Sequence, residues 1–208
     1  SSNFLKSSRV LDNYTLDVAF SPINCTAIYS AAANGTLSVN GASNLASYTS
    51  VFACGQNPDA ITAVPNTHYH FLKWDDNNST ANPRQDLNVS SAINASALFQ
   101  IDTNNISYLA DPTMGSISGS TSQIVDYGAN GTQVTAVPNV GFHFVKWSDN
   151  LTSIARSETN VIGNLTLTAI FAINTYSLTY TADSLKGIIQ GAANQTVNYN
   201  LNGTEVIA

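Results

Sequence analysis

An eighteen-residue segment occurs twice in this chain, and this repeat constrains the fold more than any other feature of the sequence. Residues 60–77, AITAVPNTHYHFLKWDDN, align without a gap on residues 133–150, QVTAVPNVGFHFVKWSDN. Further along, ALFQI at 97–101 matches AIFAI at 169–173. Self-similarity of this kind indicates tandem copies of one structural unit, here about 70 residues long.

The first and last parts of the sequence match different parts of the same unit. VLDNYTLDVAFSPI at 10–23 aligns without a gap on VIGNLTLTAIFAIN at 161–174, and residues 176–208 align on 104–136. The two parts are complementary. If the first part of one chain lay beside the last part of another, they would rebuild a repeat that lacks only the segment matching 137–151.

These alignments predict three consecutive parts of the chain. They are an N-terminal tail or donor strand, 1–20, a first β-repeat domain, 21–100, and a second β-repeat domain, 101–208, which includes an incomplete terminal repeat, 173–208. With 208 residues and 43% hydrophobic content, the chain can build a modest core in each domain.

Alternation of apolar and polar residues predicts β-strands throughout. The clearest apolar positions are Tyr14, Leu16, Val18 and Phe20, and then Leu165, Leu167, Ala169 and Phe171. Turn signals typical of hairpins separate such runs at Asn34-Gly35, Asn130-Gly131 and Asn202-Gly203. No stretch of ten residues combines a helical period with caps. We therefore predict an all-β chain of tandem small antiparallel β-sandwiches, Ig-like, with an N-terminal donor-type strand.

The charge of the chain argues against some classes of partner. Lys and Arg number 7 against 13 Asp and Glu, a net charge of -6, so there is no cationic field to hold phosphates and we expect no nucleic acid partner. No apolar run reaches the eighteen or so residues of a membrane span, and none resembles a signal peptide. The start at Ser1 fits a cleaved, secreted protein and fits an excised segment equally well.

Asn-X-Ser/Thr acceptor sites for N-linked glycans are more frequent than chance predicts for this composition. They are Asn13, Asn24, Asn34, Asn77, Asn78, Asn88, Asn94, Asn105, Asn130, Asn150, Asn164, Asn194 and Asn202. Such a density predicts a glycosylated, extracellular protein at the cell surface. Only 10% of residues are charged, and glycans would supply the missing hydration. The alternative is that a chain rich in Asn, Ser and Thr contains many such sites without use.

Both cysteines, Cys25 and Cys54, fall in the first repeat. Because the second repeat carries neither, they form a matched addition to one copy. We predict that they form a disulfide, which agrees with an oxidising, extracellular setting. The alternative is a pair of buried thiols that act as small hydrophobic groups.

Candidates for metal binding and catalysis are few. Three histidines lie near acidic residues in the sequence: His68, His70 and His143 near Asp75, Asp76 and Asp149. They belong to different repeats and form no convergent ligand set, so we predict no metal. A calcium site at Asp75, Asp76 and Asn77 lacks EF-hand spacing and is better interpreted as a polar turn. No nucleophile has an evident activating base, so we predict no enzyme activity and no cofactor.

Two further features have more than one interpretation. Trp74 and Trp147 occupy the same position in each repeat, which is typical of a core anchor, whereas a sugar-binding face would need both indoles exposed. Lys6 in the tail could form an isopeptide link between subunits if its amine were buried beside an acid.

The ordered motifs of the unit also resemble a known family. The unit contains, in this order, an aromatic strand, a Gly-X-Ile/Leu hairpin, Tyr-Gly before Asn-Gly, V-T-A-V-P, His-Phe-X-Lys-Trp and N-X-T-X-T-A-X-F. This order resembles the divergent internalin-B-type repeats of prokaryotic surface proteins. His68 stands where that pattern has Gly, and Cys54 where it has Tyr. The resemblance implies a tandem module of cell-surface stalks and adhesins, with no catalytic residues to transfer.

Sequon density and low charge are also similar to the surface filament proteins of archaea. Among these, the thread-type subunits have two β-domains and a tail strand that completes the neighbouring subunit. This similarity implies identical subunits as partners in a head-to-tail polymer that supports adhesion or contact between cells.

Two functional hypotheses follow. In the first, Tyr14, Leu16, Val18 and Phe20 form a donor strand that fills the incomplete terminal repeat of a neighbouring copy. In the second, the protein is a monomeric stalk or adhesin fragment that presents a surface for a glycan or a host protein.

Overall fold

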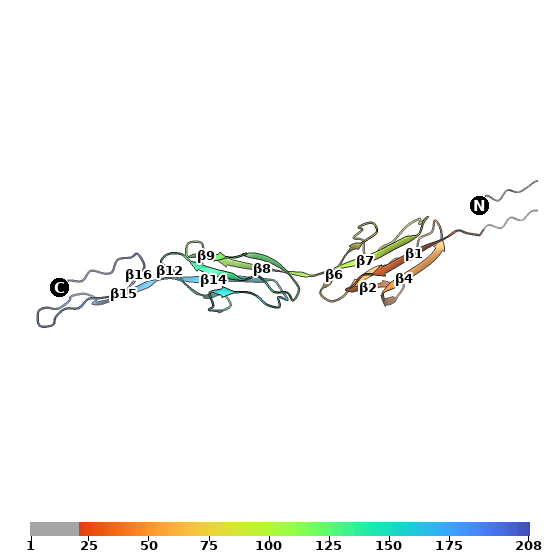
Figure 1. Cartoon of the computed structure of the whole chain (residues 1–208). Helices are drawn as coiled ribbons and strands as arrows, with labels where there is room; N and C mark the ends of the chain where they lie inside the picture. The colour runs from red at the N-terminus through yellow and green to blue at the C-terminus, as the bar shows by residue number, and fades with distance from the viewer. Residues whose placement is uncertain (1–20) are drawn as a thin grey trace, which may run out of the picture. The chain divides into compact units, whose positions relative to one another are not determined.

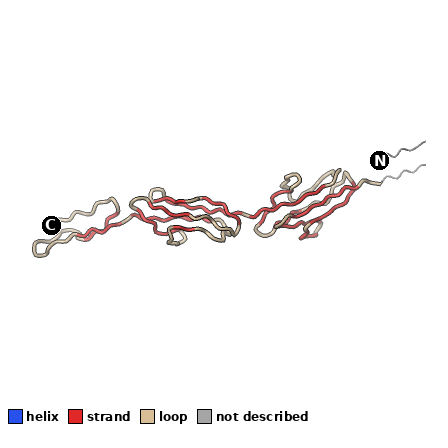
Figure 2. Tube along the Cα trace, viewed as in Figure 1, coloured by secondary structure: helices blue, strands red, loops and turns tan. Residues whose placement is uncertain are grey.

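The computed structural model describes residues 21–208, and strands and loops account for all of them (Figures 1 and 2). The chain divides into two compact units between Gln100 and Ile101. Within residues 21–208, no helix is long and apolar enough to cross a bilayer. The predicted all-β class of tandem sandwich repeats is confirmed.

Unit 1 is a sandwich of two sheets. Its larger sheet has the order β4-β1-β7-β6, and its smaller sheet has the order β3-β2-β5. The strands are β1 (Asn24–Ala31), β2 (Gly35–Val39), β3 (Ala42–Leu45), β4 (Ser47–Ala53), β5 (Thr62–Pro65), β6 (Tyr69–Trp74) and β7 (Ile93–Ile101).

Unit 2 repeats this plan with a sheet of order β10-β8-β14-β12 and a second sheet of order β13-β11-β9. The strands are β8 (Thr103–Ala110), β9 (Gly115–Ser118), β10 (Ser122–Asp126), β11 (Val134–Pro138), β12 (Phe142–Trp147), β13 (Ala155–Arg156) and β14 (Leu165–Ile173). A third, two-stranded sheet follows, made of β15 (Thr175–Thr179) and β16 (Asn194–Asn198).

The larger sheets differ from the purely antiparallel arrangement that the sequence suggested. β1 pairs with β7 in parallel, and β8 pairs with β14 in parallel. Parallel neighbours need a long connection between them, and here the intervening residues supply it by forming the opposite sheet. Each repeat is therefore a mixed sandwich in which its first and last strands lie side by side.

The core of each unit lies between its two sheets. In unit 1 the largest fully buried side chains are Trp74, Tyr29, Leu37 and Ile61, and in unit 2 they are Trp147, Ile106 and Val134. Edge-to-face ring contacts join Trp147 to Tyr108 and Phe144, with centroids 5.9 and 5.7 Å away. Aromatic pairs in this geometry stabilise a core beyond the area they bury.

Candidate functional site

In the terminal repeat, 173–208, the two strands pair in the same register as the corresponding first strands of unit 2. β15 and β16 pair Thr175 with Asn198, just as β8 and β10 pair Thr103 with Asp126. The opposite sheet also begins here, because Gln190 bridges Ile207 as Ser118 pairs with Thr135. The terminal repeat is thus one half of a sandwich, with the start of both sheets in place.

A glutamine holds this half-sandwich together in the same way as its counterpart in unit 2. The Gln195 side chain donates to the carbonyls of Ala192 and Thr204, at 3.0 and 2.8 Å, and accepts from the Thr204 amide at 2.6 Å. Gln123 makes the same three bonds to Ser120 and Thr132. The half-sandwich is therefore built to the pattern of a complete repeat.

The inner face of the half-sandwich is open. Tyr180 is 37% exposed, whereas its counterpart Tyr108 is 3% exposed. Leu178 and Val206 are only partly buried, whereas their counterparts Ile106 and Val134 are almost fully buried. An open hollow of about 410 Å³ beside β16 is lined in part by Gln195, Val197 and Leu201.

The open face results from two strands that cover unit 2 and have no counterpart on the terminal repeat in the described part of the chain. In unit 2, β14 pairs with β8, and β12 pairs with β14. β15 pairs only with β16 among residues 21–208. An uncovered apolar face beside an unpaired strand edge is a place where another strand can add.

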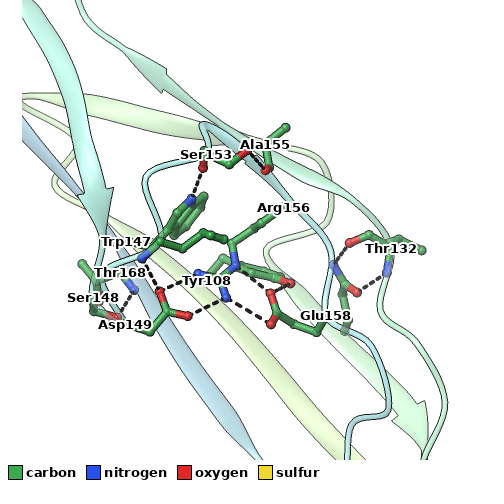
Figure 3. A network of polar contacts seen from close by, with 12 residues as sticks. Tyr108, Thr132, Trp147, Ser148, Asp149, Ser153, Ala155, Arg156, Glu158 and Thr168 are labelled. Carbon is green, nitrogen blue, oxygen red and sulfur yellow. Dashed lines mark hydrogen bonds and ion pairs between the residues drawn. The ribbon is translucent and has the colours of Figure 1, made fainter.

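A second site, inside unit 2, is a buried arginine clamp (Figure 3). Arg156 is 6% exposed, and its guanidinium donates to both carboxylate oxygens of Asp149 and of Glu158, at 2.6 to 3.1 Å. The Tyr108 hydroxyl donates to Glu158, and burial together with this carboxylate raises the pKa of Tyr108 to about 12. The Arg156 hydrogen bonds hold the pKa of Asp149 below its usual range.

Unit 1 contains the same clamp. Arg84 donates to both carboxylate oxygens of Asp76 and of Asp86, and the Tyr29 hydroxyl donates to Asp86. The Arg84 hydrogen bonds lower the pKa of Asp76. An alignment of the two repeats pairs Arg84 with Arg156 but does not reveal their acidic partners. The available signal was an acidic residue two positions after each arginine, at Asp86 and Glu158.

Four of the residues considered for a metal site make other contacts. Asp76 and Asp149 bind the clamp arginines, Asp75 accepts from the Ser96 amide, and a ring nitrogen of His143 lies 2.8 Å from Asn174 Oδ1. Among residues 21–208 no three His, Cys, Asp or Glu side chains gather in a way that could hold a metal ion.

The two tryptophans are core anchors. Trp74 and Trp147 are both 0% exposed, and their indole N–H groups donate to the carbonyls of Ala81 and Ser153. A sugar-binding face needs exposed rings, so the sugar-binding interpretation of these two residues is wrong.

Comparison with known families agrees with this architecture. The sequence model of the divergent InlB B-repeat domain matches the chain twice, over residues 25–103 and 108–175. The chain belongs to this family. No curated protein matches the chain at a significant level. Divergent InlB B-repeats are typical of surface-associated proteins, which agrees with the resemblance found in the sequence motifs.

The first of the two B-repeats carries the predicted disulfide. Cys25 in β1 and Cys54, directly after β4, are joined, with their Cα atoms 5.0 Å apart. Cys54 occupies the position of Tyr127 in the second B-repeat, because its amide donates to Ile23 as the amide of Tyr127 donates to Asp102. The disulfide thus ties the beginning of β1 to its neighbour.

The sequons lie on the surface of the B-repeats. Twelve of the thirteen asparagines fall within residues 21–208, and all twelve are exposed. In Asn78 and Asn150 the side-chain Oδ1 accepts from Lys73 and Lys146. A glycan joins through Nδ2, so these contacts are compatible with glycosylation.

The predicted donor-strand residues Tyr14, Leu16, Val18 and Phe20 lie outside the described residues, as do Asn13 and Lys6.

Proposed function

We propose that this protein is the subunit of an extracellular, glycosylated surface filament that supports adhesion or contact between cells. Residues 14–20 of one copy add to the terminal repeat of the next copy as a donor strand. The open face of that repeat carries the proposal, because it presents the inner surface of a B-repeat without the strands that cover it in unit 2.

The covering strand of unit 2 defines what the open face accepts. In β14, Leu165 lies opposite Ile106 and Leu167 lies opposite Tyr108. Leu167 and Ala169 are buried in the core. An occupant of the open face must therefore be an extended strand, parallel to β15, with apolar residues at alternate positions.

Residues 14–20 meet this requirement. The gapless alignment with β14 sets Tyr14 on Leu165, Leu16 on Leu167 and Val18 on Ala169. Transferred to the terminal repeat, Tyr14 would lie opposite Leu178 and Leu16 opposite Tyr180. The donor strand would cover the apolar face and satisfy the free edge of β15 at the same time.

Two further observations support the extracellular, glycosylated setting of the proposal. The disulfide suits an oxidising environment, and twelve exposed sequons suit a glycan-coated surface. The sequon density and the low charge are similar to those of archaeal surface filament proteins, and we propose this protein as a filament subunit of the thread type.

A charge placed on the apolar face of the donor strand tests the proposal. Leu16→Asp or Val18→Asp should leave folded monomers that do not polymerise, because a carboxylate would have to enter the apolar face. Ala19→Asp places the same charge on the alternate face, leaves the Asn13 sequon intact and serves as the matched control. Light scattering and negative-stain electron microscopy measure the polymer.

Protein from native cells provides the complementary experiment. Regular filaments that dissociate in hot detergent into glycosylated monomers support donor-strand assembly, and ladders that survive the detergent point to isopeptide links. If the native protein is dispersed and monomeric, or if Leu16→Asp polymerises like the unmodified chain, the filament proposal is wrong. The monomeric stalk or adhesin then becomes the better explanation.

A further inference from the structure

Each complete repeat places a glycine directly beneath a phenylalanine of its last strand. A Cβ added to Gly115 would lie 2.6 Å from Cζ of Phe171, which is closer than any real side chain tolerates. In unit 1, a Cβ at Gly35 would collide with the ring of Phe99. Any side chain at these two positions would therefore displace the ring.

The two pairs are equivalent positions of the repeat. Gly35 begins β2 and pairs with Pro65, whereas Gly115 begins β9 and pairs with Pro138. In unit 2 the ring above the glycine also meets Phe144 edge to face, with centroids 6.0 Å apart.

The terminal repeat has the same glycine without the ring. In unit 2 the amide of Gly115 donates to the carbonyl of Asp111, and in the terminal repeat the amide of Gly187 donates to that of Asp183. The turns before the two glycines therefore match. Nothing among the described residues lies within 4 Å of a Cβ placed on Gly187. The space above Gly187 is therefore open in the described chain, whereas Phe171 fills the space above Gly115, and we call this open space the slot.

We infer that Phe20 of the neighbouring copy occupies the slot above Gly187 and sets the register of the donor strand. The inference rests on the proposed function and adds the contact that determines its specificity. The alignment that sets Tyr14 on Leu165 also sets Phe20 on Phe171. No other residue of the donor strand falls on this position in that register.

The Phe20–Gly187 pair explains how a strand with several apolar residues selects one register. A slip of two residues keeps the apolar face inward but places Val18 above Gly187. Valine is too short to fill the space of a phenyl ring and leaves a cavity, which costs stability. The correct register is the one that leaves no void.

Filling the slot from the acceptor side tests the inference. Gly187→Leu should raise the concentration needed for polymerisation at least tenfold, because the leucine occupies the space of the ring. Its monomer should fold normally, since the slot is empty. Gly163→Leu is the matched control, because Gly163 also has open space around its Cβ position. This variant should polymerise like the unmodified chain.

A second pair of variants tests contact directly. Phe20→Cys combined with Gly187→Cys should give covalent ladders on a non-reducing gel, and Phe20→Cys combined with Gly163→Cys should give none. If Leu16→Asp blocks polymerisation while Gly187→Leu polymerises normally and the cysteine pair stays uncrosslinked, the register inference is wrong and donor-strand assembly stands. If neither Leu16→Asp nor Gly187→Leu affects polymerisation, both are wrong.

Discussion

The guanidinium carbon of Arg156 lies 5.0 Å from the ring centroid of Trp147. The equivalent pair in unit 1, Arg84 and Trp74, has a separation of 5.3 Å. In each unit the arginine also binds two carboxylates, so a buried cation is neutralised and four of its five N–H groups donate to carboxylate oxygens of the same repeat. The tryptophan and the arginine form one structural element in each of the two repeats.

Removal of the clamp arginine should destabilise its own unit. Arg156→Ala leaves the partly buried Glu158 without its cation, and we expect a loss of about 3 kcal/mol in the free energy of unfolding of unit 2. Hydrogen exchange read by mass spectrometry separates the two units, and unit 1 should keep its protection. Arg156→Lys should recover only part of the loss, because an ammonium cannot bind both carboxylates in a bidentate manner. Equal loss in both units would contradict this assignment.

The clamp also predicts how stability depends on pH. The arginines lower the pKa of Asp76 and Asp149 in the folded protein. Their contribution is therefore present above the unfolded pKa of about 4 and is lost as the pH falls through the folded value. Denaturant midpoints should stay level between pH 5 and 8 and decrease below about pH 4. In Asp149→Asn, the denaturant midpoint of unit 2 should decrease less at low pH than in the unmodified protein. If the midpoint of this variant falls as steeply below about pH 4 as in the unmodified protein, the prediction is wrong.

Reduction of the disulfide should affect unit 1 alone. Cys25 and Cys54 are 29 residues apart, and closing a loop of this size stabilises the fold by about 3–4 kcal/mol. Cys25→Ser combined with Cys54→Ser should lower the thermal midpoint of unit 1 by several degrees in calorimetry. Unit 2 serves as the internal control, and a similar shift in both units would exclude this explanation.

The paired glutamines predict two different outcomes for one substitution. Gln123→Ala should cost unit 2 about 1–3 kcal/mol, because the Thr132 amide and two carbonyls lose their partners in a buried site. Gln195→Ala removes the same three bonds from an exposed site, so monomer stability should change less. If the terminal repeat is an acceptor, this variant should instead polymerise less well in light scattering. If the two variants lose the same free energy of unfolding, burial does not distinguish the two glutamine sites.

The strand pattern could be predicted from the sequence because period-two alternation is a local signal. Leu165, Leu167 and Phe171 predicted β14 correctly, and the shared position of Trp74 and Trp147 predicted core anchors. The disulfide followed from two cysteines within one repeat.

The parallel pairing and the arginine clamp could not be predicted in the same way. Alternation indicates a strand but carries no information about the direction of its neighbour, so β8 and β14 were expected in an antiparallel sandwich. The clamp joins Asp149, Arg156 and Glu158 to Tyr108, which lies about 50 residues earlier, and no local pattern marks such a contact. The slot at Gly187 became visible only through the rings that fill its two counterparts.

The parallel contact of β8 with β14 has a mechanical consequence. The chain enters the second repeat along β8 and leaves it along β14, and a single residue, Asn174, separates β14 from β15. A pull on the two ends of the repeat would slide these neighbours past each other. The backbone bonds from Leu165 to Ala169 would then be strained together, and they would not open one after another as in a peeled hairpin. Such a repeat resists tension along the chain, as the proposed filament would require.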